Sequence, residues 1–146
     1  MWIAKYITSY SKSRVALISI LSFSLSSLNN IYKLLASNSN TIINTYKSDI
    51  SIMDIDLKLK LIDNWLMKID INLVKKDPNM NLMYSKINET CINISAIIKI
   101  INEKIIYHNT KWFNYWRNLD LEDDIKSLKK EIEILNSRLV LINLVK

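Results

Sequence analysis

Residues 78–116 read PNMNLMYSKINETCINISAIIKIINEKIIYHNTKWFNYW, and this stretch decides the fold. Its apolar residues recur at alternating steps of four and three, the spacing that places side chains on one face of an α-helix. These seam positions are Met80, Tyr84, Ile87, Cys91, Ile94, Ile98, Ile101, Ile105, His108, Trp112 and Tyr115. Asp77 is an N-cap candidate, and Pro78 suits the first helical position. The pattern therefore predicts one long amphipathic helix over 78–116.

Three further stretches carry apolar stripes of the same kind, and they predict helices over 11–36, 54–75 and 120–145. The first of these helices starts at about Ser11 or earlier. The stripe of 11–36 consists of Leu17, Leu21, Leu28, Ile31 and Leu35, and it faces away from a polar stripe of Ser19, Ser22, Ser26, Asn29 and Lys33. The stripe of 54–75 consists of Ile55, Leu59, Ile62, Leu66, Ile69 and Leu73. The stripe of 120–145 consists of Leu121, Ile125, Leu128, Ile132, Leu135, Leu139 and Ile142, with Asp120 as its N-cap candidate. Residues 42–53 either continue in a helix or belong to a longer connection.

The chain has 146 residues, no glycine and one proline. Doubly wound α/β folds, phosphate-binding loops and nucleophile elbows depend on glycine for backbone angles that other residues reach at a cost. The connections between the last three predicted helices are short, which favours antiparallel neighbours. We therefore expect a single all-α domain, an antiparallel up-down bundle of about four long amphipathic helices with coiled-coil-like heptad packing.

Enzymatic chemistry is not expected from this sequence. Cys91 and His108 are the single cysteine and the single histidine, and both fall on the seam of 78–116, where a buried role is ordinary. A structural zinc site needs about four ligands. The acidic residues from Asp120 to Asp124 lie at a predicted helix N-terminus, where the helix dipole favours negative charge, so a metal ion is not needed to explain them. No catalytic residue, cofactor or metal is predicted.

The net charge is +6, and most of the excess lies in residues 1–50 and 79–118. A basic surface can attract acidic proteins, nucleic acid or an anionic membrane. The magnitude is modest, no nucleic-acid-binding motif is present, and nucleic acid is not the expected partner. The abundance of Ile, Leu, Asn, Lys and Ser is typical of coding by an AT-rich genome, as in some large DNA viruses and parasites.

A membrane alternative rests on the N-terminal region. Residues 15–32 carry no charge over 18 positions, the lower limit for a span, yet five serines and two asparagines lie among them. An aligned polar face favours a soluble amphipathic helix. Residues 1–10 either dock onto the bundle or a partner, which we favour, or lie at a membrane interface. An intracellular or virion location is expected rather than a secreted one.

Two features predict where a partner binds. Trp112, Trp116 and Arg117 crowd the end of the 78–116 helix, and such residues are frequent interface hot spots. The alternative is that they cap the end of the bundle.

Helix 120–145 carries a second apolar line beside its seam, formed by Ile134, Leu141 and Val145. A helix that is apolar on more than one face is usually buried on more than one side. A similar secondary stripe of Leu57 and Leu61 lies beside Trp65, and it either packs on the flank of the bundle or binds another helix.

The expected function is that of a non-enzymatic helical interaction or structural protein. It would form one component of a larger protein assembly or a homo-oligomer, and a viral structural or assembly protein fits the composition. A membrane-associated protein that uses residues 1–35 is the alternative. A basic nucleic-acid-binding bundle is the third interpretation.

Overall fold

The computed structural model describes residues 2–36, 41–109 and 119–142, without the side chains of 2–13, 71, 73 and 75. Six α-helices and no strand occur within these residues. The helices are α1 (Trp2–Ala36), α2 (Thr41–Ile52), α3 (Ile55–Lys68), α4 (Ile71–Lys76), α5 (Pro78–Asn109) and α6 (Glu122–Ile142). The all-α prediction is confirmed.

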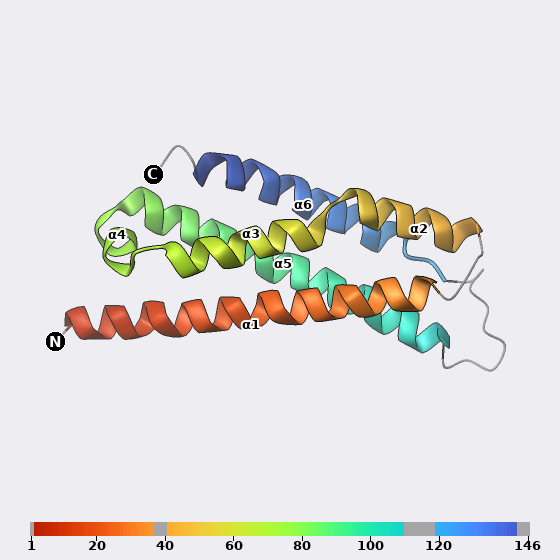
Figure 1. Ribbon diagram of the computed structural model, residues 1–146, viewed down its shortest axis with the longest axis horizontal. Coiled ribbons are helices and arrows are strands. Elements are labelled where there is room, and N and C mark those ends of the chain that lie inside the picture. The colour runs from red at the N-terminus through yellow and green to blue at the C-terminus, as the bar shows by residue number, and fades with distance from the viewer. Residues whose placement is uncertain (1, 37–40, 110–118, 143–146) are drawn as a thin grey trace.

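The long helices lie lengthwise beside one another (Figure 1). Helix α5 packs against α1 on one side and against α6 on the other. Helices α2 and α3 follow each other along the bundle, and α2 contacts both α1 and α6, while α3 contacts α1. Short α4 packs on α5. Four helical segments, namely α1, α2–α3, α5 and α6, therefore share one interior.

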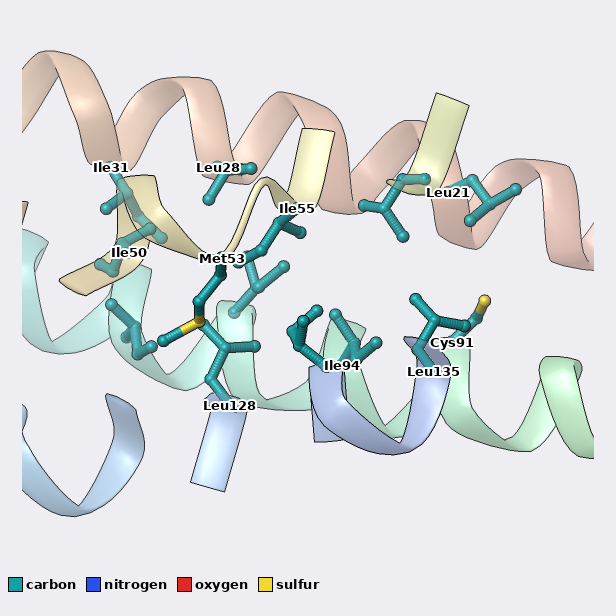
Figure 2. Packing of buried hydrophobic residues seen from close by; sticks show 14 of the residues in the cluster. Leu21, Leu28, Ile31, Ile50, Met53, Ile55, Cys91, Ile94, Leu128 and Leu135 are labelled. Carbon is teal, nitrogen blue, oxygen red and sulfur yellow. The ribbon is translucent and has the colours of Figure 1, made fainter. Parts of the chain in front are cut away.

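The predicted stripes meet in that interior. Ile94, Ile98 and Ile101 of α5 are fully buried, as are Leu17 and Leu21 of α1. Figure 2 shows side chains from α1, the α2–α3 region, α5 and α6 pointing into a common centre, where the labelled residues are Leu21, Leu28, Ile31, Ile50, Met53, Ile55, Cys91, Ile94, Leu128 and Leu135. Burial of each large apolar side chain contributes roughly 1.5–3 kcal/mol. Packing of these stripes, rather than helix propensity, therefore stabilises the long helices.

The expected N-caps of the last two long helices are present. The Asp77 carboxylate accepts a hydrogen bond from the Asn79 N–H at 2.9 Å, and the Asp120 carboxylate accepts one from the Glu122 N–H at 3.1 Å. The predicted ends of these helices, at 110–116 and 143–145, lie outside the described residues. Helix α1 begins at Trp2, which is the earlier start that the sequence also allowed, so the backbone of 2–10 is helical.

Residues 42–53, for which the sequence left two interpretations, lie mostly in α2. Met53 and Asp54 form the turn into α3, and Asp54 adopts a left-handed conformation with φ 53°. Aspartate tolerates this conformation better than most residues, which matters in a chain without glycine.

The prediction of one continuous helix over 54–75 was wrong. Helix α3 ends at Lys68, and Ile69 is extended (φ −69°, ψ 133°). Asp70 then begins a new helix, because its carboxylate accepts a hydrogen bond from the Asn72 N–H at 2.9 Å and its carbonyl accepts one from Val74. An aspartate side chain that caps a helix start competes with helix continuation. The chain therefore turns into α4, and Val74 is buried there.

Candidate interaction surface

Polar contacts at both ends fix α6 on α5. At one end, the Arg138 guanidinium donates hydrogen bonds to the Lys86 carbonyl at 2.6 Å and to the hydroxyl of fully buried Thr90. At the other end, the Lys104 ammonium lies 2.6 Å from the Asp124 carboxylate. This hydrogen bond raises the pKa of Lys104. These contacts hold one flank of α6 against α5 and leave its other flank for α2 and the outside.

A similar contact fixes α1 on α5. The Asn30 amide donates a hydrogen bond to the Asn102 side-chain oxygen at 2.9 Å, and both residues are half-buried. Tyr46 of α2 holds the start of α6, because its hydroxyl donates to the Leu119 carbonyl at 3.3 Å and accepts from the Leu121 N–H at 3.2 Å. These contacts determine which side of α1 and of α6 faces outward.

The predicted line on α6 is partly exposed. Leu141 is 44% exposed and the neighbouring Val140 is 67% exposed, whereas Ile134 is half-buried. Val145 lies outside the described residues, as do Trp112, Trp116 and Arg117. The structure therefore places part of the predicted partner surface on the outside of α6 and leaves the tryptophan cluster untested.

The secondary stripe on α3 is more exposed. Leu57 and Leu61 are 50% and 52% exposed, and they lie one helical turn apart. Trp65 continues the line and is half-buried, with its ring centroid 6.5 Å from that of Tyr84 on α5. The stripe therefore packs on the bundle only in part, because two of its leucines are about half exposed to solvent.

A groove of about 530 Å³ lies beside this stripe. Its lining residues come from the end of α3, the break that follows it and the start of α5, and they are Leu61, Asn64, Trp65, Lys68, Ile69, Asp70 and Met80. The groove exists because the chain leaves the α3 axis at Ile69. The groove was not predicted from the sequence, because the apolar pattern continues through the break. The spacing of Asp70 and Asn72, typical of a helix cap, was the signal that could have revealed it.

The described residues hold no group of three or more His, Cys, Asp or Glu side chains placed to bind a metal ion. Cys91 is buried, and this burial raises the pKa of its thiol to about 12. A thiol in that environment stays protonated near neutral pH and is a poor nucleophile. His108 is half-buried near the end of α5, with its ring edge toward Tyr107.

The segment Arg14–Ala36 of α1 is long and apolar enough to cross a membrane. A third of its most apolar window is buried in the bundle. The five residues of the predicted polar stripe on this helix are all exposed, whereas the opposite apolar stripe is buried. The side chains of residues 2–10 lie outside the description, so their docking or membrane role stays a prediction.

The chain is similar to an uncharacterized protein of Acanthamoeba polyphaga mimivirus. The two are 40% identical over 73 residues, which is 50% of this chain and 34% of the relative. The chain thus matches about a third of the length of that viral protein. No family model matches the sequence, and no solved structure matches the chain.

Proposed function

We propose that this protein is a non-enzymatic helical interaction protein that forms a component of a larger protein assembly. The observation that carries the proposal is the exposure of apolar side chains outside a filled core, among them Leu57 and Leu61 one turn apart on α3 and the adjacent Val140 and Leu141 on α6. Contiguous apolar patches on a protein surface mark interaction sites. The similarity to a mimivirus protein supports a viral origin. A viral structural or assembly protein is the form of this proposal that fits such an origin.

The bundle that presents these side chains is, in this proposal, antiparallel with heptad-type packing. Lys104 near the end of α5 contacts Asp124 near the start of α6, whereas Arg138 near the end of α6 contacts Lys86 near the start of α5. This reversed order supports antiparallel packing of α5 and α6. Helices α1 and α5 run parallel, because Asn30 and Asn102, which contact each other, both lie near the carboxyl ends of their helices. Figure 1 supports an up-down order, since the chain direction alternates from α1 to α2–α3, α5 and α6. The buried four-three stripes support seams of the coiled-coil kind.

Sedimentation velocity of the purified 17.1 kDa chain in detergent-free buffer tests the proposal. The expected result is a soluble species whose mass is a defined multiple of the monomer mass. Changing Ile134 and Leu141 together to Glu should lower that mass while the far-ultraviolet circular dichroism is unchanged. A wild-type monomer at every concentration up to about 1 mM contradicts self-assembly. Unfolding of the double variant would instead place the α6 line inside the core.

A membrane-associated function is the second candidate, and the apolar Arg14–Ala36 segment favours it. Insertion would require α1 to leave the bundle, because its apolar stripe is the part that packs on the other helices. Flotation with vesicles of phosphatidylcholine and phosphatidylserine distinguishes the two functions. Membrane association predicts that the chain floats with the vesicles and needs detergent to stay soluble, whereas the assembly function predicts that it remains in the lower fractions.

A further inference from the structure

Four residues on one side of α3 and the N-cap residue that precedes it are spaced symmetrically about Leu61, and we name them the α3 strip: Asp54, Leu57, Leu61, Trp65 and Lys68. Leu57 and Trp65 lie four residues before and after Leu61, and Asp54 and Lys68 lie seven before and after it. At about 100° per residue, the four positions within α3 fall on one flank of the helix. Asp54 stands at the start of its first turn, because the Asp54 carbonyl accepts a hydrogen bond from the Lys58 N–H. The strip therefore has an acid at one end, a base at the other, and apolar side chains between.

The strip is open to a partner. Asp54 and Lys68 are exposed, and neither belongs to a salt bridge among the residues that the structure describes. Leu57 and Leu61 are about half exposed, while half-buried Trp65 is anchored on the core side by Tyr84. An acid and a base at the two ends of one apolar line complement the same line turned end to end.

We propose that the α3 strip pairs with the α3 strip of a second copy of this chain, antiparallel about a two-fold axis at Leu61. In that arrangement residues equally far before and after Leu61 lie opposite each other. Leu61 meets Leu61 of the second copy, Leu57 meets Trp65, and Asp54 meets Lys68, each of the last two pairs occurring twice. Every apolar side chain gains an apolar neighbour, and every charge gains the opposite charge.

The groove beside Trp65 offers a place for a side chain of the second copy. Leu57 of the second copy arrives at the height of Trp65, next to the groove of about 530 Å³ that Leu61, Trp65 and Met80 line. A leucine side chain that enters an apolar groove loses contact with water on most of its surface. The two-fold axis provides this contact twice, once for each copy.

The size of the contact sets the expected affinity. Helix α3 has 14 residues and is therefore about 21 Å long. A single pair of helices this short buries less surface than the roughly 1,600 Å² of a standard interface. We expect a dissociation constant on the order of micromolar, so the measurements cover about 1 µM to 1 mM. The inference rests on the proposed function, because it names the chain's own copy as one partner in the assembly.

The first test places a charge on the axis. Leu61→Glu brings two carboxylates face to face and removes two buried leucines, so the dimer dissociation constant measured by sedimentation should rise on the order of 100-fold. Met67→Glu is the matched control, because Met67 is 65% exposed on the side of α3 that faces Arg14 of α1. This control should leave the constant within about threefold of wild type. Equal effects of the two variants would overturn the proposal.

The second test asks whether the effect of Asp54→Asn on the dimer changes sign when Lys68 is replaced by Glu, and it does not depend on packing. Lys68→Glu places a glutamate opposite Asp54 and should weaken the dimer. Asp54→Asn alone should also weaken it, because the pair with Lys68 is lost. In the Lys68→Glu background the same Asp54→Asn change should strengthen the dimer, because it removes a repulsion. Weakening by Asp54→Asn in both backgrounds would show that the two residues do not meet.

The third test reports the geometry directly. Leu61→Cys brings two thiols together at the axis, so mild oxidation with diamide should give a covalent dimer, whereas Met67→Cys should not. Cys91 is buried and serves as an internal control in both variants. The Leu61→Cys cross-link should persist in the Ile134→Glu/Leu141→Glu variant. If wild type forms a multimer but no cross-link appears at residue 61, this pairing fails and the proposed function stands. If wild type is monomeric, this pairing and self-assembly both fail.

Discussion

Two isoleucines two positions apart on α5 give the most direct test of the bundle. Ile98 is fully buried in the core, whereas Ile100 is 44% exposed on the outer face of the same helix. Replacing Ile98 with Ala removes three carbons from a filled interior and should lower the free energy of unfolding by about 2–5 kcal/mol. Ile100→Ala should change it by less than about 1 kcal/mol, since alanine's higher helix propensity offsets part of the lost contact.

These energies convert into melting temperatures. At about 2.1 cal/mol/K per residue, 146 residues give an unfolding entropy of roughly 300 cal/mol/K, so 1 kcal/mol corresponds to about 3 °C. Ile98→Ala should therefore lower the midpoint by roughly 6–16 °C and Ile100→Ala by less than about 3 °C. Thermal melts followed by circular dichroism at 222 nm provide the measurement, and urea titrations with an unchanged slope confirm that stability alone has changed. Equal losses for the two variants would refute the assignment of the core face.

Three further outcomes follow from the polar contacts and the buried thiol. Asn30→Leu alone should destabilise the fold by about 1–2 kcal/mol, because Asn102 loses its hydrogen-bond partner. Leucine at both positions should recover most of that loss in urea titrations. A double variant that is less stable than the single variant would contradict this. Arg138→Met should cost about 1–3 kcal/mol, and the cost should shrink when Thr90 is already valine if the two side chains act together. Cys91 should react with Ellman's reagent at pH 8 only after unfolding. Burial raises the pKa of the Cys91 thiol to about 12, so the buried neutral thiol contributes its full stability below about pH 9 and loses it as the pH rises toward 12. Cys91→Ala should flatten this decline of the free energy of unfolding in alkaline urea titrations.

The sequence predicted those parts of the fold that depend on local periodicity. The α5 and α6 seams follow a four-three pattern without interruption, and the residues at those positions that the structure describes are largely buried. The caps at Asp77 and Asp120 were also predictable, because a carboxylate two residues before an exposed N–H is a local arrangement. Contacts such as Asn30 with Asn102 could not be predicted, since they depend on which helices become neighbours and at what register.

The candidate surface likewise has one part that follows from local periodicity and one part that depends on packing. The stripe of Leu57, Leu61 and Trp65 is periodic, and the sequence predicted it as a second apolar face. The groove beside it depends on the break at Ile69 and on Met80, which arrives from another helix. The helix was predicted to continue because Ile69 and Leu73 keep the apolar spacing, while the capping interaction of Asp70 outweighs that spacing in the structure.

The turn at Asp54 connects the absence of glycine to the proposed surface. Of the residues that the structure describes, Asp54 is the one with a positive φ, and in a chain without glycine this conformation falls to aspartate or asparagine at the least cost. Asparagine would make the same turn without a charge. The aspartate places a carboxylate at one end of an apolar line that ends in Lys68 at the other. The turn requires a residue of this shape, whereas its charge can serve the N-terminus of α3 and a charged partner surface. Asp54→Asn therefore separates the two roles, because it should leave the melting temperature of the isolated monomer within about 3 °C of wild type and change the dimer dissociation constant.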